Sequence, residues 1–488
     1  MRFRPKRTER GTVFCDVNEF ERALVGKSKT LGSFDEHFEG VGPVYVVRVP
    51  GRLDVMGGIA DYSGSVVCEA LLSEAVVLGL QKRKEPQVRI YSVGLEAHHM
   101  NPRFEMSLTD FRKSGRLISY AAARKLFARS AETAWAGYMA GCFYTLTREE
   151  KVEFASGADI VLTSTIPLGA GISSSAAIEM ATLHAVNIAY GLKIDPVRLA
   201  HLGQKTENRV VGAPCGLMDQ LTETLGEHGH LLAIECQPDN ILGTVRMPRG
   251  CAAVGINSNV KHAVGGPKYT RVRVAAFMGH KIILSLMRKR GQAGSRGDPM
   301  QGYLARITPK QFKEQFERHL PPTITGKEFL KRYGNTCDPV TKIDPDETYH
   351  VRSRTSHPIY ENGRVREFLD CLERADATGE EDPLIRAGRL MYGSHWSYRN
   401  RCGLDSPETN LLVKLARDIG IDGGLYGAKI TGGGSGGTVA VLGRENLIMD
   451  SVARVVESYR QRTGIHADVF CGTSPGALEF GHLEYEPA

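Results

Sequence analysis

The chain has 488 residues, of which 42% are hydrophobic and 24% are charged, and its formal net charge is +7. This length is enough for two or three domains, and the composition is that of an ordinary globular protein, which excludes disorder on a large scale. Lysine and arginine are scattered among acidic residues, so nucleic-acid binding is not indicated, and no apolar run reaches the roughly 18 residues of a membrane-spanning helix.

The spacing of the cysteines and the basic N-terminal residues bear on the cellular location of the protein. The ten cysteines form neither a C-x-x-C pair nor a cluster with histidine at zinc spacing, so we expect reduced thiols and a cytoplasmic protein. The stretch from Met1 to Arg7 is basic but lacks the apolar segment of a secretory signal. A disordered tail is the preferred interpretation, and an organelle signal is the alternative.

In the first half of the chain, short β-like runs come before helical ones. Alternation and turn residues predict strands at 44–49, 65–68, 76–80, 88–91 and 160–162. A helical stretch is expected at 131–146, and apolar residues at helical spacing predict a helix from Ser173 to Tyr190, ended by Gly191.

In the second half, residues 288–348 are rich in charge, glycine and proline, and we interpret them as an insertion on a second domain. Beyond them, the pattern predicts helices at 410–419 and 447–459 and a strand at 438–442. Because helices and strands do not alternate regularly, the chain is expected to be an α+β protein and not a doubly wound sheet.

The strongest motif is the glycine- and serine-rich segment from Ile166 to Ala177, between the strand at 160–162 and the helix that begins near Ser173. Its small residues allow a ligand to approach the backbone closely, and the helix directs free N–H groups and its positive end at an anion. The segment therefore predicts a phosphate site, although a plain turn with a helix cap would have the same composition.

A second segment runs from Val49 to Gly64 and places Arg52 and Asp61 nine residues apart in an expected loop between two strands. A cation and a carboxylate there can converge on one polar ligand, or they can form an ordinary surface ion pair. The third segment, Ala428 to Thr438, contains G-x-G-x-x-G but is followed by a strand-like run, so it does not predict a dinucleotide site.

Together, in identity and order, these three segments resemble the motifs of the GHMP kinases, in their galactokinase-like sugar-1-kinase branch. Residues between the motifs extend the resemblance to galactokinases. Trp135 to Tyr138 is similar to a W-x-x-Y segment, Gln204 to Gln220 to Q-x-x-E…G-x-P-C-G-x-M-D-Q, and Asn257 to Tyr269 to N-S-x-V-x-H…Y. The likeness is strongest to the members that act on L-arabinose.

The resemblance implies a two-domain fold with the active site in the cleft between the domains. It implies an N-terminal domain, residues 1–245, that is similar to ribosomal protein S5 domain 2. A ferredoxin-like C-terminal domain, residues 246–488, would carry the insertion at 288–348, and the final strand is expected to pack back onto the first domain.

The resemblance also implies the site residues and their ligands, ATP, Mg²⁺ and a sugar. Asp219 would be the general base toward the anomeric hydroxyl, with Arg52 stabilising the transferred charge. Mg²⁺ would be held by Glu207 and Ser174. The expected ATP-binding residues are Gly169, Gly171, Ser173, Ser174, Ser175 and Trp135, and the expected sugar-binding residues are Asp61, Tyr269, Gly58, Ile59 and Gly433.

The predicted sugar depends on one departure from galactokinases, which carry G-E-H-T-D-Y where this chain has Gly57 to Tyr62. Without the Glu and His, a C6 hydroxyl would lack polar partners, so we predict a preference for L-arabinose, which has no C6, and β-L-arabinose 1-phosphate as the product. The alternatives are D-galactose, a uronic acid, or a non-catalytic sensor of sugar and ATP. No nucleic-acid or membrane partner is expected, and the oligomeric state is not indicated.

Overall fold

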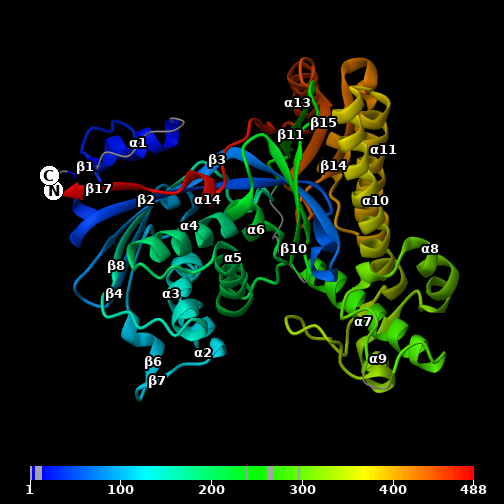
Figure 1. Cartoon of the computed structure of the whole chain (residues 1–488), viewed down its shortest axis with the longest axis horizontal. Helices are drawn as coiled ribbons and strands as arrows, with labels where there is room; N and C mark the ends of the chain where they lie inside the picture. Colours follow the sequence, from blue (N-terminus) through cyan, green and yellow to red (C-terminus); the bar gives the residue numbers. More distant parts are fainter. Residues whose placement is uncertain (1–2, 6–13, 238, 261–266, 295–296, 488) are drawn as a thin grey trace.

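The computed structural model describes residues 3–5, 14–237, 239–260, 267–294 and 297–487. They form two sheets with helices packed on them and a helical lobe beside the smaller sheet (Figure 1). Lys261 and His262, part of the galactokinase-like stretch before Tyr269, lie outside these residues. The α+β class is confirmed.

The large sheet has nine strands in the order β1-β17-β2-β3-β8-β4-β5, and β9 joins β3 to β10. All of its pairs are antiparallel except β4 with β8. Its strands are β1 (Phe3–Pro5), β2 (Val41–Met56), β3 (Val66–Lys82), β4 (Gln87–Ser92), β5 (Arg103–Ser107), β8 (Ala158–Ser164), β9 (His230–Glu235), β10 (Asn240–Arg246) and β17 (Leu483–Pro487).

Helices cover one face of this sheet, where α4 and α6 pack against β2 and β3 (Figure 1). The apolar side chains of α4 are buried nearly all round because the sheet lies on one side and other helices on the other. The helices of this layer are α2 (Tyr120–Phe127), α3 (Gly137–Glu149), α4 (Ser174–Ala189), α5 (Pro196–Lys205) and α6 (Met218–Leu225). The short α14 (Ala477–Phe480) packs against α4, α6 and β2, and α1 (Cys15–Leu24) contacts β3.

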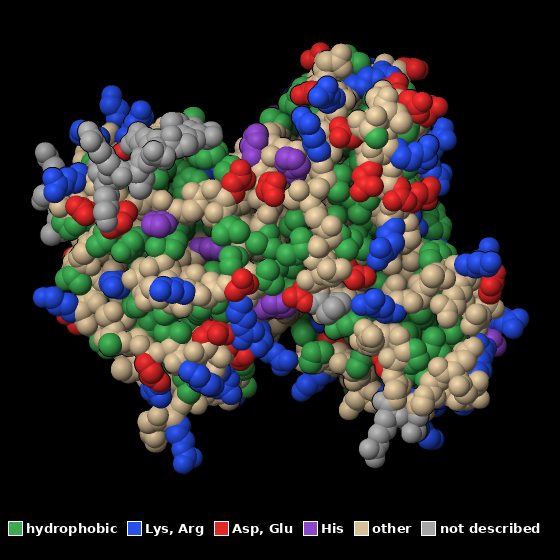
Figure 2. All heavy atoms as spheres, viewed as in Figure 1, with side chains coloured by type: hydrophobic (Ala, Val, Ile, Leu, Met, Phe, Trp, Pro, Cys, Tyr) green, Lys and Arg blue, Asp and Glu red, His purple; other side chains and the backbone are tan. Residues whose placement is uncertain are grey.

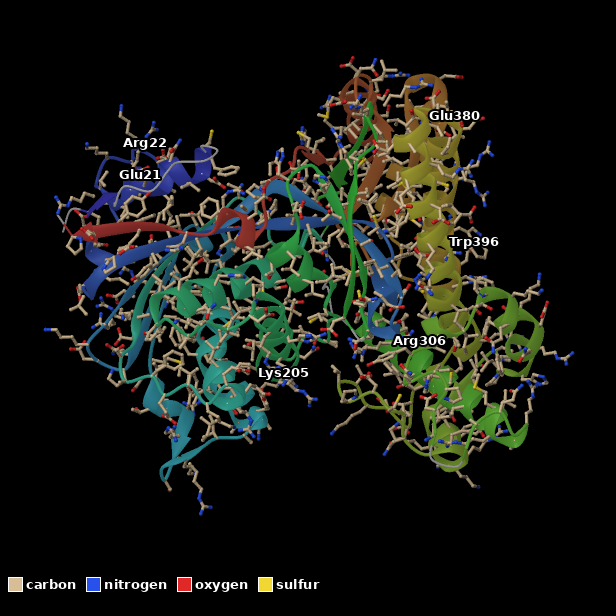
Figure 3. The ribbon with its side chains drawn as sticks, in the orientation of Figure 1. Glu21, Arg22, Lys205, Arg306, Glu380 and Trp396 are labelled. Atoms are coloured by element: carbon tan, nitrogen blue, oxygen red, sulfur yellow. The ribbon has the colours of Figure 1, made fainter. Side chains whose placement is uncertain are left out.

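The small sheet has the order β14-β15-β11-β16, all antiparallel. Helices α11, α12 and α13 pack on it, and α10 packs against α11 and α7. The elements are β11 (Cys251–Asn257), β14 (Leu425–Ile430), β15 (Thr438–Arg444), β16 (Asp468–Phe470), α7 (Pro267–Lys289), α10 (Val351–Thr378), α11 (Asp382–Ser397), α12 (Pro407–Ile419) and α13 (Ile448–Thr463). Trp396 projects outward from α11 and is exposed (Figure 3).

The predicted insertion forms a lobe with its own apolar core, shared with α7 and α10. It contains α8 (Pro309–Gln311), α9 (Gly326–Tyr333) and a two-stranded pairing of β12 (Ile324–Thr325) with β13 (Thr348–Tyr349). Acidic and basic side chains are interspersed over the face drawn in Figure 2. Within the described residues, no helix combines the length and apolar character needed to cross a membrane.

Several predicted elements need correction. The runs at 65–68 and 76–80 belong to one strand, β3, and Phe3–Pro5, expected in a disordered tail, form β1 against β17. Arg52 lies on β2 and not in a loop, because that strand continues through Pro50 with shifts of register that accommodate the proline. The helix expected from residue 131 begins at Gly137, after a short 3₁₀ turn.

The return of the final strand is confirmed, because β17 pairs with β2 in the large sheet. The domain boundary near residue 245 stays a prediction. β10, in the large sheet, ends at Arg246, and β11, in the small sheet, begins at Cys251.

Candidate active site

A cleft of about 730 Å³ lies among residues from the large sheet, α4, α6, α7 and the β14–β15 loop. Every residue of the predicted site except Trp135 lines it. These residues are Arg52, Gly58, Ile59, Asp61, Gly169, Gly171, Ser173, Ser174, Ser175, Glu207, Asp219, Tyr269 and Gly433. The fold thus brings together residues that are up to 381 positions apart (433 − 52).

The glycine- and serine-rich loop leads into α4 with three residues in the left-handed region, Gly169 (φ 76°), Gly171 (φ 78°) and Ser173 (φ 64°). No side chain caps the first turn of α4. The first backbone N–H groups of this helix and the positive end of its dipole are therefore available to an anion in the cleft.

The three serines of this loop differ in their surroundings. The Ser173 hydroxyl donates to Ile172 O at 2.7 Å and to a carboxylate oxygen of Glu223, so it is directed into the protein. The Ser175 hydroxyl donates to Glu207 Oε1 at 3.0 Å. Ser174, half-buried between them, also lines the cleft. The loop therefore presents Ser174 and the Ser175–Glu207 pair on one wall.

Arg52 is the central cation of the cleft. Its Nε donates to Asp219 Oδ1 at 2.8 Å, its Nη1 donates to Gly171 O at 2.9 Å, and Glu69 Oε2 lies 3.5 Å from Nε. Burial lowers the pKa of Arg52, but the carboxylates of Asp219 and Glu69 outweigh burial and hold the pKa above its usual value. The guanidinium therefore stays charged, with Asp219 held against it at the second residue of α6.

Two further carboxyl groups of the cleft titrate close to neutrality. Burial, and then repulsion by Asp219, raises the pKa of Asp61 to about 7 and that of Glu207 to about 7. Gln220 Nε2 donates to Glu207 Oε2 at 2.9 Å and so fixes that carboxylate. Crowding of acidic groups around one arginine is typical of sites that receive a cation or exchange a proton.

The Asp61 carboxyl group is packed against Gly216. A Cβ at Gly216 would lie 1.5 Å from Asp61 Oδ2, so any side chain there would displace the carboxyl group. Asp61 Oδ1 accepts from the backbone N–H of Tyr62 at 2.8 Å, and the positive charge of Arg273 on α7 stabilises the carboxylate. Asp61 is thus held between the segment from Val49 to Gly64, the segment before Asp219 and α7.

Behind Gly58 and Ile59, the site is closed by Tyr398, which is fully buried. Tyr398 Oη accepts from Ile59 N–H at 2.9 Å and donates to Gly432 O at 3.0 Å. A Cβ at Gly58 would lie 1.5 Å from Tyr398 Oη. The phenol therefore occupies the space that a side chain at position 58 would need, and its hydroxyl is already bonded to two backbone groups.

A buried ion pair lies next to this corner. Lys429 Nζ on β14 donates to Asp54 Oδ2 at 2.7 Å, and both side chains have no exposed area. Asp54 also accepts from Gly58 N–H and Gly432 N–H, each at 3.0 Å. The pair joins the second and third glycine-rich segments, Val49 to Gly64 and Ala428 to Thr438, and so fixes the backbone on both sides of the cleft.

Trp135 does not line the cleft. Its Nε1–H donates to Asn101 O at 3.0 Å, so the indole supports the segment that contains His98, His99 and Met100. These three residues and Tyr138 do line the cleft, and sequence reasoning did not assign them to the site. Only Tyr138 carried a signal, as the last residue of the W-x-x-Y segment.

Comparison with known proteins agrees with this geometry. The model of the family "GHMP kinases N terminal domain" matches residues 137–227. Residues 137–227 are thus similar to a GHMP kinase N-terminal domain. This segment holds the glycine- and serine-rich loop before α4, Glu207 and Asp219, whereas Arg52, Asp61, Tyr269 and Gly433 come from outside it. The resemblance predicted from the motifs is confirmed.

L-arabinokinase from Arabidopsis thaliana is 39% identical to this chain, over 95% of the chain and 48% of that protein. The chain therefore spans about half the length of this curated relative. Lactococcus lactis galactokinase, solved with galactose, has a TM-score of 0.68 at 22% identity and covers 91% of this chain and 96% of its own. Methanococcus jannaschii mevalonate kinase follows, with a TM-score of 0.52 at 13% identity over 88% of this chain and 98% of its own. These likenesses show the GHMP kinase fold.

Proposed function

We propose that this chain is an ATP-dependent sugar-1-kinase that phosphorylates the anomeric hydroxyl of L-arabinose, giving β-L-arabinose 1-phosphate and ADP. The observation that carries the proposal is the Arg52–Asp219 pair, which faces the cleft beside the uncapped start of α4. A carboxylate, a fixed positive charge and a phosphate site within one cleft are what phosphoryl transfer requires.

Each residue then has a role in the transfer. The loop at Gly169 to Ser173 and the first turn of α4 bind the phosphates of ATP. Asp219 accepts the proton of the anomeric hydroxyl, and Arg52 neutralises negative charge as the phosphoryl group moves. Asp61, Tyr269 and Gly433 orient the sugar through hydrogen bonds. Trp135, which does not line the cleft, supports the segment at 98–100 and does not itself contact the adenine.

The oxygen atoms of Ser174 and Glu207 in the cleft suit Mg²⁺, which prefers oxygen ligands and keeps several waters. Within the described part of the chain, no three His, Cys, Asp or Glu side chains are placed to enclose a metal ion. Glu207 and Ser174 would therefore hold the ion together with the phosphates of ATP, and the ion would offset phosphate charge. Ser175, which is bonded to Glu207, would orient that carboxylate.

The choice of sugar rests on the corner at Gly58 and Ile59. No side chain at position 58 can reach the sugar, and the hydroxyl behind it, on Tyr398, is engaged with Ile59 and Gly432. A C6 hydroxyl placed there would lose hydrogen bonds to water, at a cost of about 1–3 kcal/mol. A uronic acid would need a cation at the same place, and Lys429 is buried and already paired with Asp54.

The test is an assay of ADP release with L-arabinose, D-galactose and D-glucuronic acid as acceptors. We expect kcat/KM to be higher for L-arabinose than for D-galactose, by up to about 10²-fold, because an apolar pocket rejects an added hydroxyl only weakly. Equal values, or a preference for galactose, would overturn the sugar assignment. Binding of sugar and ATP without ADP release would instead support a non-catalytic sensor.

We also propose a cytoplasmic location, because the spacing of the ten cysteines in the sequence favours reduced thiols.

A further inference from the structure

Outside the cleft, a cysteine, a histidine and an aspartate come together where α7 meets the insertion. His280 on α7 is buried, with its Nδ1 3.7 Å from Cys337 Sγ and its Nε2 3.0 Å from Asp298 Oδ2. Cys337 itself is exposed. A thiol that solvent can reach therefore contacts a histidine whose other nitrogen is paired with a carboxylate.

The arrangement is a relay and not a metal cage. The two ring nitrogens of His280 face different partners, so the thiol and the carboxylate lie on opposite sides of the ring. Asp298 is fixed by backbone N–H groups of Met300 at 2.9 Å and Gly302 at 2.7 Å, so it presents Oδ2 to the ring in one orientation. Carboxylate, imidazole and thiol in this order are the elements of an activated sulfur nucleophile.

The charge balance favours a protonated ring. Burial lowers the pKa of His280, but the contacts with Asp298 and Cys337 outweigh burial and raise the pKa to about 9. The imidazolium, stabilised by Asp298, therefore places a positive charge 3.7 Å from Cys337 Sγ.

We propose that Cys337 is a reactive thiol that exchanges with low-molecular-weight disulfides, and that its modification weakens ligand binding in the cleft. Cys337 Sγ releases its proton to solvent, the His280 imidazolium stabilises the thiolate, and the thiolate attacks one sulfur of the disulfide. The S–S bond of the reagent breaks, a mixed disulfide forms on Cys337, and the second sulfur leaves as a thiolate. No net oxidant beyond the disulfide itself is consumed.

Cys337 is connected to the cleft through the residue that follows it, Asp338. Asp338 holds the guanidinium of Arg273 with two contacts, Nε at 3.0 Å and Nη2 at 2.9 Å. Arg273 Nη1 in turn donates to Cys215 O at 3.2 Å, in the segment that lines the cleft, and its charge stabilises Asp61. A bulky group on Cys337 would disturb Asp338 and, through Arg273, the residues assigned to the sugar. This second half of the inference rests on the proposed function.

The first experiment measures thiol reactivity and needs no catalysis. The native protein reacts with dithiodipyridine, a neutral disulfide, and peptide mapping follows each cysteine. Cys471 is the internal control because it is also exposed. We expect Cys337 to react about tenfold faster than Cys471 at neutral pH, and His280→Gln to remove that advantage while leaving the Cys471 rate unchanged. Equal rates for the two cysteines, or an unchanged Cys337 rate in His280→Gln, would overturn the proposal.

The second experiment tests the coupling. The protein is converted to its glutathione mixed disulfide, and sugar and ATP binding are measured by calorimetry, with Cys337→Ser treated in the same way as the control. We expect weaker sugar binding, unchanged ATP binding and recovery with dithiothreitol, with no effect in Cys337→Ser. Unchanged sugar affinity would refute the coupling while the reactive thiol stands. If the unmodified protein binds no sugar, the proposed function fails, and the reactivity measurement still decides the first half.

Discussion

The substitution Asp219→Asn tests the catalytic role of Asp219 separately from its contribution to the stability of the protein. The substitution keeps size and a hydrogen-bond acceptor but removes the group that would take the proton. A general base contributes about 10²–10⁴-fold, which corresponds to about 3–5 kcal/mol of activation free energy. We therefore expect kcat to fall by that factor while ATP still binds.

The effect on folding should be much smaller. Removing one partner of a buried pair commonly costs about 3–5 kcal/mol, because the other charge is left alone. Here Glu69 remains 3.5 Å from Arg52, and the asparagine oxygen still accepts from the guanidinium. Loss of the negative charge also relieves Asp61 and Glu207, whose pKa values Asp219 raises. We expect the free energy of unfolding to change by less than about 2 kcal/mol.

The assay compares ADP release, ATP binding by calorimetry and urea unfolding for the wild type, Asp219→Asn and Glu227→Gln. Glu227, just beyond α6, has a side chain that is 52% exposed, so it controls for loss of a carboxylate in this region. Turnover within a few-fold of the wild type in Asp219→Asn would remove Asp219 from the mechanism. Loss of ATP binding or of the fold would show that its role is structural.

Three further changes have defined outcomes. Ser174→Ala should weaken the apparent affinity for magnesium–ATP, and an unchanged magnesium titration would exclude Ser174 as a ligand. Tyr398→Phe should lower the free energy of unfolding by about 1–3 kcal/mol in urea, because both backbone partners of the hydroxyl are buried; a change near zero would contradict the contacts seen here. The pKa of Asp61 is about 7 in the folded state, which is above its value in the unfolded chain. Between these two pKa values, the folded protein keeps the proton that the unfolded chain has lost. The stability contributed by protonated Asp61 is therefore lost as pH rises from about 4 to about 7. The Tm of the wild type should fall between pH 5.5 and 8 by more than the Tm of Asp61→Asn. An equal fall in both proteins would refute the raised pKa of Asp61.

Local patterns were enough to find most of the cleft. The loop before Ser174, the segment around Arg52 and the segment from Ala428 were each ambiguous alone, but their order along the chain resembled the GHMP kinases, and that resemblance added Asp219. The helix from Ser174 and the strand at Thr438 were also predicted closely, because their apolar spacing and flanking glycines are local signals.

The residues and elements that local patterns missed depend on contacts between residues far apart in the sequence. His98, His99 and Met100 enter the cleft from a short turn with no motif, supported by Trp135. Tyr398 follows α11 and reaches Gly58 across 340 positions (398 − 58). The long β3 was divided in two because Glu69, buried beside Arg52, interrupts its apolar pattern. The roles of such residues become visible only once the fold has brought their partners next to them.

The buried pair of Asp54 and Lys429 has a mechanical consequence. Pulling the two sheets apart at this point would leave two charges without partners inside the protein, at a cost of about 3–5 kcal/mol, and would also break the contact of Asp54 with Gly432 N–H. The pair therefore holds β2 of the large sheet to β14 of the small sheet. If the cleft opens to admit a ligand, we expect the smallest displacement beside Gly58, whose N–H donates to Asp54.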